Sequence, residues 1–125
     1  MRTTHRRHAA ITGSAIRHAG LLCTEAVPDA RRLSCVEDTI RIEVPEAEFR
    51  IRLTRPTPAT TRLCFQAVFR EDEPAGGTWW SSWEVDVTAP ATSPEVGHAL
   101  AAEVTHSRHT FATALADAQH GAEAA

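Results

Sequence analysis

The sequence predicts an α+β domain in which a four-stranded antiparallel sheet, a meander, carries N-terminal and C-terminal helices packed on one face. The middle of the chain alternates apolar and polar residues, turn-forming residues divide it into segments, and both flanks have helical spacing. A chain of 125 residues has room for one domain. We therefore expect residues 1–125 to form a single unit, with residues 1–4 and 121–125 frayed.

The first helix is expected within residues 5–22. One helical face collects residues at spacings of four, three and four: Ile11, Ala15, His18 and Leu22. Pro28 and Asp29 favour a turn after this helix. A further short strand at 33–36 is left open and is not one of the four.

The alternating region begins at Thr39 and ends at Val87. Four stretches of period two are expected as strands: residues 39–44, 49–54, 63–70 and 79–87. Pro56 and Pro58 exclude a central strand between the second and third stretches, so residues 55–61 are expected to form a loop. Residues 71–77, which contain a Gly pair, are expected to form a longer hairpin loop.

The second helix is expected to begin after Ser93, which is a good N-cap residue, with Pro94 in the first position. It should continue to about Asp117. Its apolar side is expected to pack on the sheet through Val96, Leu100, Val104, Phe111 and Leu115.

The face of the sheet that points away from the helices is a candidate protein-docking surface. Its expected partner-binding residues are Arg41, Arg50, Arg52, Arg62, Arg70 and Trp80. Arginine and tryptophan are enriched among the residues that dominate binding at interfaces. The alternative is a solvated face of cross-strand ion pairs, because acidic residues alternate with these arginines.

The opposite face of the same strands offers a candidate ligand pocket between the sheet and the helices. Its lining would be aromatic: Phe65, Phe69, Trp79 and Trp83. Such residues line many small-molecule sites, but they are also ordinary core residues. Packing within the core is therefore the alternative.

Three histidines share the outward stripe of the second helix: His98, His106 and His109. His106 and His109 lie one turn apart and could share a metal ion if a third ligand came from elsewhere, for example from His5 and His8. A solvated stripe, or a partner surface that gains charge below about pH 6.5, is the alternative. We expect no cofactor.

Several classes of function are disfavoured by composition. A net charge of -3 does not suggest a nucleic-acid partner, and no apolar stretch approaches the length of a membrane span. The N-terminus lacks an apolar signal-peptide core, so we expect a cytoplasmic protein. Three cysteines without a C-x-x-C pair indicate neither a disulfide framework nor a zinc ribbon. The common catalytic and nucleotide-binding motifs are absent from the sequence.

The sequence therefore suggests a small non-catalytic protein-binding or regulatory domain, expected to form a homodimer. An inhibitor of a larger enzyme, of the type carried by mobile elements, would have this size and mild acidity. The alternative is a small-molecule-binding domain or an enzyme that uses the aromatic pocket.

Overall fold

The computed structural model describes residues 11–70 and 78–124, with side chains described as far as residue 118. Its elements are α1 (Gly13–Ala26), β1 (Arg31–Val36), β2 (Thr39–Val44), β3 (Ala47–Thr57), β4 (Thr60–Arg70), β5 (Thr78–Val87) and α2 (Pro94–Ala124). This confirms the α+β class and the order of helix, sheet and helix. Of the ends expected to fray, residues 1–4 and 125 lie outside the described residues, and the backbone at 121–124 is helical.

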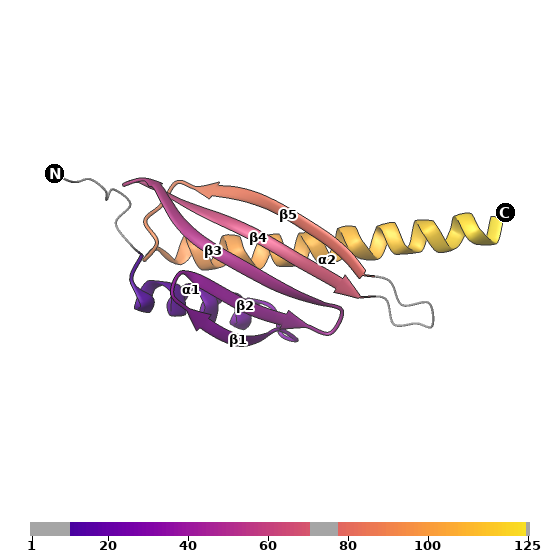
Figure 1. The fold of residues 1–125 in the computed structure, drawn as a ribbon, viewed down its shortest axis with the longest axis horizontal. Helices are drawn as coiled ribbons and strands as arrows, with labels where there is room; N and C mark the ends of the chain where they lie inside the picture. The colour runs from indigo at the N-terminus through magenta and orange to yellow at the C-terminus, as the bar shows by residue number, and fades with distance from the viewer. Residues whose placement is uncertain (1–10, 71–77, 125) are drawn as a thin grey trace.

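The five strands form one antiparallel sheet in which each strand pairs with the next along the chain (Figure 1). The prediction of four strands was wrong by one, because β1 is a strand of the sheet. Its residues do not alternate between buried and exposed, since its first three are all exposed. Period two is the sequence signal of a strand with one buried face, and β1 carries little of it.

The loop predicted at residues 55–61 is much shorter in the structure, because residues 55–57 belong to β3 and residues 60–61 to β4, which leaves only Pro58 and Ala59 in the turn. The β3–β4 pairing shifts register between Thr54 and Thr57, and Pro56 lies within that irregularity. The pairing of β3 with β2 ends at Arg52, so this part of β3 has a neighbour on one side only. Proline is tolerated in strands at such edges and bulges.

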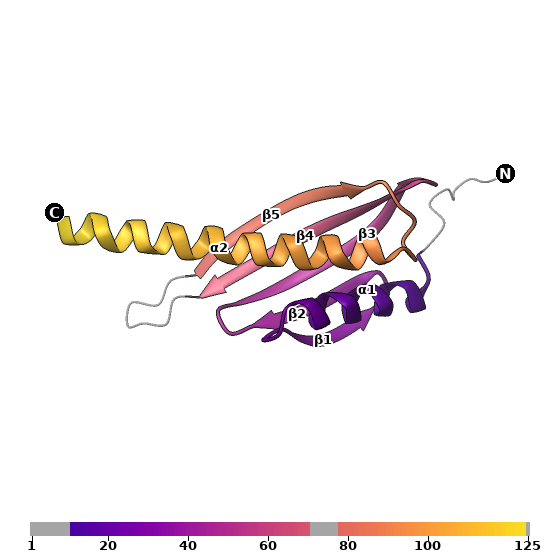
Figure 2. The same cartoon turned by 180° about the vertical axis from the view of Figure 1, so that it is seen from behind.

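Both helices lie on the same face of the sheet (Figure 2). The helix α1 packs against β1 and β2, and α2 packs against β4 and β5. The two helices also pack against each other. The C-terminal half of α2 extends past the end of the sheet in both views.

The core lies between the helices and the inner face of the sheet, as the alternation predicts. Phe49 and Phe65 are 0% and 1% exposed, whereas Arg50 and Arg52 lie on the other face and are exposed. The predicted face of α1 was right in part, because Ala15 is buried and Ile11 packs against the core. His18 is exposed, and the residues that α1 buries are Ala15, Ile16, Ala19, Gly20 and Cys23.

The start of α2 agrees with the prediction, because Ser93 Oγ accepts a hydrogen bond from the backbone N–H of Glu95 at 3.2 Å. Val96, Leu100 and Val104 are fully buried, and Phe111 packs against the core. The helix continues to Ala124 and does not end near Asp117. In the described part of the chain, neither helix combines the length and the apolar character needed to cross a membrane.

Candidate functional site

The open face of the sheet carries the predicted docking residues. The strand register sets Arg41 beside Arg50 and sets Arg62 beside Asp86. Acidic side chains lie among the arginines: Glu43, Glu48, Glu84 and Asp86. Trp80, at the β5 edge of this face, is 73% exposed. The structure thus places the six predicted residues on one face, with Trp80 at its border.

Glu48 lies between two of these arginines and accepts hydrogen bonds from both. Its Oε2 is 3.1 Å from Arg41 Nη2 and 3.3 Å from Arg50 Nε. Partial burial raises the pKa of Glu48, but the hydrogen bonds from the two guanidinium groups outweigh this effect and hold the pKa below its usual range. Two of the predicted docking arginines are therefore engaged with the same carboxylate.

Two further arginines of the open face also lie beside acidic side chains. Arg62 Nε donates to Asp86 Oδ1 at 2.8 Å, and the hydrogen bond lowers the pKa of Asp86. Arg52 Nε lies 4.0 Å from Asp38 Oδ2. Exposed pairs of this kind contribute little to stability, and they leave the face with no strong potential of either sign. The arginines therefore provide a patterned surface and not a concentrated positive patch.

Two of the three cysteines, Cys23 and Cys64, have thiols that are not activated as nucleophiles. Burial raises the pKa of the Cys23 thiol to about 12. Cys64 lies on the open face beside Glu84, and its partial burial and that carboxylate both raise its pKa. Because the thiolate is the reactive form, both thiols are held in the unreactive state at neutral pH.

A groove of about 430 Å³ lies between β5 and α2. We call it the aromatic groove and define it by its ring-bearing residues: Phe69, Trp79, Trp80, Trp83 and Phe111. Three of the four residues predicted to line a ligand pocket are among these. The fourth, Phe65, is buried and stacks against Trp83 with ring centroids 4.8 Å apart.

The rings of the aromatic groove are held by one another and by one polar contact. Phe111 stacks on Phe69 at 4.5 Å and meets Trp79 edge-on at 5.9 Å. Trp83 Nε1 donates to Glu103 Oε1 at 2.8 Å, which fixes this indole against α2. The groove is consequently a preformed apolar surface at the side of the sheet.

The two outer strands of the sheet differ in how open their edges are. The strand β1 has six residues, begins with Arg31 and Arg32, and shifts register between Arg32 and Ser34. Arg32 Nη1 also donates to the carbonyl of Arg17, which attaches this edge to α1. Short length, basic residues and bulges are the features that prevent an edge strand from pairing with another chain.

The strand β5 has none of these protective features in its first half. It has ten residues, contains no proline, lysine or arginine, and pairs with β4 without a register shift. Its only charged residues, Glu84 and Asp86, lie in the second half. In the described part of the chain β5 pairs with β4 alone, so its other side presents backbone groups to solvent.

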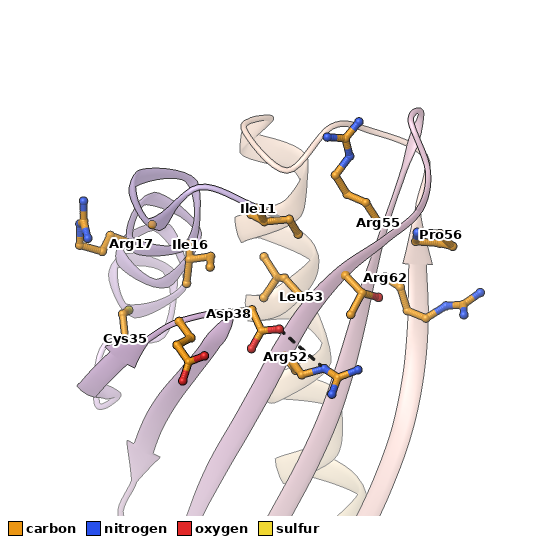
Figure 3. Close-up of a pocket in the computed structure, with 13 residues that line it drawn as sticks. Ile11, Ile16, Arg17, Cys35, Asp38, Arg52, Leu53, Arg55, Pro56 and Arg62 are labelled. Carbon is orange, nitrogen blue, oxygen red and sulfur yellow. Dashed lines mark ion pairs between the residues drawn. The ribbon is translucent and has the colours of Figure 1, made fainter. Parts of the chain in front are cut away.

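A second pocket, of about 640 Å³, lies at the end of the sheet near the start of α1 (Figure 3). Four arginines line it: Arg17, Arg52, Arg55 and Arg62. The labelled guanidinium groups of Arg17, Arg55 and Arg62 point away from one another, and Arg52 is directed towards Asp38. Because the arginines do not converge on one point, this pocket is not a built anion site.

The predicted histidine stripe is exposed along α2. His98, His106 and His109 all face solvent, and His106 borders the aromatic groove. Within the described residues no group of three potential ligands gathers around a point where a metal ion could bind. His5 and His8, named as possible further ligands, lie outside the described residues.

Sequence reasoning found the aromatic residues of β5 but missed their contacts with α2. The predicted meander already placed the strand 79–87 at one edge of the sheet. The missing information was that α2 would bring Phe111 and Glu103 against this strand. Comparisons of the chain with protein-family models, with curated proteins and with solved structures found no match.

Proposed function

We propose that this chain is a non-catalytic protein-binding domain that receives an extended polypeptide segment at the outer edge of β5. The observation that carries the proposal is the ten-residue edge of β5, which has the exposed indoles of Trp79 and Trp80 near its start. Strand addition uses backbone hydrogen bonds for affinity and side-chain pockets for specificity. The β5 edge would supply the backbone hydrogen bonds, and the aromatic groove would supply the side-chain pockets.

The two indoles lie on opposite faces of the sheet at the same edge. Trp80 is paired with Val68 on the open face, and Trp79 is paired with Phe69 on the helix side. A strand added beside β5 would therefore cover one indole with each row of its alternating side chains. Tryptophan contributes strongly to interfaces when it becomes buried at the centre of the contact.

Trp80 belongs to the docking surface that the sequence predicts, and it remains a partner-binding residue in this proposal. The centre of the contact is now the edge of β5 and not the middle of the open face. Arg62 and Arg70, on the neighbouring strand β4, then lie at the border of the contact, where charged residues affect the choice of partner more than the affinity. A cytoplasmic regulatory protein, including an inhibitor that blocks a larger enzyme, would act through such an edge.

A display library of random peptides, selected on the immobilised protein, tests the proposal. We expect enriched peptides with alternating apolar residues, and we expect Trp80→Lys to lose their binding at least tenfold, because a charge on an edge strand opposes pairing. Hydrogen exchange should slow at β5 when such a peptide is bound.

The matched control is Val36→Lys on the opposite edge strand β1, where Val36 is 61% exposed. This variant should bind the selected peptides as the parent does. Peptides that bind Trp80→Lys as tightly as the parent, or that slow exchange elsewhere than β5, would contradict the proposal.

The aromatic groove also favours a second candidate function, the binding of a small aromatic molecule. Its volume suits one ring system, and Glu103 and His106 provide polar groups at its rim. Ala114→Phe should fill the groove and abolish saturation-transfer signals from aromatic fragments, while thermal unfolding shows that the variant is still folded. Equal fragment signals in parent and variant would exclude this second function.

A further inference from the structure

We infer that the segment bound at the β5 edge is β5 of a second copy of this chain, paired antiparallel across a two-fold axis. The inference rests on the proposed function, since it names the partner that the edge receives. A two-fold dimer needs a surface that complements itself. An edge strand complements itself when it pairs antiparallel with the same strand of a second copy, because the first half of each strand then lies beside the second half of the other.

The charges of β5 fit this arrangement. The first half is uncharged and carries Trp79 and Trp80, and the second half carries Glu84 and Asp86. In an antiparallel pair centred on Ser82, Glu84 lies opposite Trp80 of the second copy. No two acidic residues then lie directly opposite, a placement that would destabilise the pair.

The same register keeps each row of side chains on its own face of the sheet. With Ser82 opposite its own copy, Trp79 lies opposite Val85 of the second copy, both on the helix side. Aromatic and β-branched residues are favourable cross-strand partners. The two sheets would join into one continuous sheet, with both copies of α2 on the same side.

Arg70 gives an additional reason for this register. It is exposed, and no acidic side chain pairs with it among the described residues. Arg70 is paired with Thr78 of β5, and Thr78 would lie opposite Asp86 of the second copy. Two strand spacings, about 10 Å, separate the backbones of Arg70 and that Asp86, and an extended arginine side chain covers most of this distance. Asp86 already accepts hydrogen bonds from Arg62 of its own copy, so Arg70 would be a second guanidinium group beside the same carboxylate.

The size of the contact sets the affinity to expect. Trp79 and Trp80 are 41% and 73% exposed, which together amounts to roughly 250 Å² of indole surface in each copy. The indoles of both copies thus supply about 500 Å², less than half of the roughly 1,200 Å² that specific complexes bury, so a weak dimer is expected. We therefore expect dissociation constants on the order of 1–100 µM.

Sedimentation velocity across about 1–300 µM tests self-association in this range. The parent chain should pass from monomer to dimer. Ser82→Lys and Ser82→Glu should each remain monomeric, because either substitution places two like charges opposite each other on the two-fold axis. An equimolar mixture of the two variants should again form dimers, since lysine then faces glutamate.

The control pair is Val36→Lys and Val36→Glu on β1, which should each dimerise as the parent does. A melting temperature within a few degrees of the parent value shows that each variant is folded. The inference is overturned if the parent stays monomeric throughout the range, if the mixture of Ser82 variants stays monomeric, or if the Val36 variants dissociate.

These outcomes separate the two proposals. A monomeric parent whose β5 edge still captures display peptides would refute self-pairing and leave the protein-binding function standing. A parent that neither dimerises nor captures peptides would refute both. A dimer that dissociates when a selected peptide is added would support both, because the peptide and the second copy then compete for one edge.

Discussion

At the scale of single residues, Glu37 shows a conflict between side chain and backbone. It lies in the tight turn between β1 and β2 and has φ of 55°, a left-handed conformation that costs a non-glycine residue about 1 kcal/mol. Nothing in the sequence pattern indicates that glycine would be favoured here. The turn is held by its flanking strands, because Val36 pairs with Thr39.

Glu37→Gly should therefore stabilise the protein by up to about 1 kcal/mol, offset in part by the greater freedom of glycine in the unfolded chain. Urea unfolding followed by circular dichroism measures the change. Asp38→Gly is the control, because Asp38 does not have a positive φ and should lose stability. Equal effects at the two positions would show that the backbone conformation at Glu37 carries no cost.

At the scale of elements, the contact between α1 and α2 depends on a glycine. A Cβ atom placed on Gly97 would lie 2.5 Å from Leu22 Cβ and 2.8 Å from Leu22 Cδ1. The helices come this close because α2 has no side chain at that position. Glycine weakens a helix by about 1 kcal/mol relative to alanine, so its presence here reflects packing and not helix propensity.

Gly97→Ala should destabilise the protein by about 1–3 kcal/mol, since the helices must move apart or Leu22 must leave its rotamer. Thermal unfolding measures this loss. Gly13→Ala is the matched control, because a Cβ there meets only the flexible Arg17 side chain, and it should be neutral or stabilising. Adding Leu22→Ala to Gly97→Ala should recover part of the loss, and failure to recover any would contradict the contact.

The elements also show which parts of the fold the sequence reveals. Strands β2 to β4 were predictable because every second residue is buried, as in the pattern of Ile40, Ile42 and Val44. The strand β1 was not, because half of it has no buried side chain to alternate. The inner face of α1 was predicted only in part, because small residues, such as Ala19 and Gly20, fill most of it, and small residues give weak periodicity.

At the scale of the whole molecule, Arg108 joins three segments that are distant in sequence. From α2 it donates two hydrogen bonds to Asp29, both at 2.7 Å, and two to Glu46, at 2.8 and 3.0 Å. Asp29 lies in the turn between α1 and β1, and Glu46 lies in the turn between β2 and β3. The hydrogen bonds from Arg108 lower the pKa of Asp29 and raise that of Arg108.

Arg108→Gln should lower the free energy of unfolding at neutral pH by about 1–2 kcal/mol, a value discounted because Asp29 is half exposed to solvent. The pKa of Asp29 is lowered in the folded state. Its ion pair with Arg108 therefore stabilises the fold at pH values above 3.8, the ordinary pKa of aspartate, and this stabilisation is lost as the pH falls below that value. The stability difference between parent and variant should therefore shrink below pH 4.

Chemical unfolding between pH 3 and pH 7 measures this difference. The control is Arg55→Gln, at an arginine that has no acidic partner among the described residues. It should show a small loss that does not vary with pH. A constant difference between the parent and Arg108→Gln across this range would contradict the role assigned to Asp29.

The candidate site was predictable in its residues but not in its arrangement. Alternation placed Trp80 and Trp79 on opposite faces of a strand, and the structure agrees. The predicted meander already made this strand the last in the sheet. The pattern could not show that Glu103 would hold Trp83 from α2. Such contacts depend on which elements become neighbours in space, and that order is set by the packing of the whole chain.

The unequal outer strands also determine where growth of the sheet would stop. Two copies joined through β5 would expose only β1 at either side, and β1 is short, basic and kinked. Further copies would find no compatible strand to extend, so the assembly would close at two subunits and would not elongate into a fibre. A sheet with two edges like β5 would have no such stopping point.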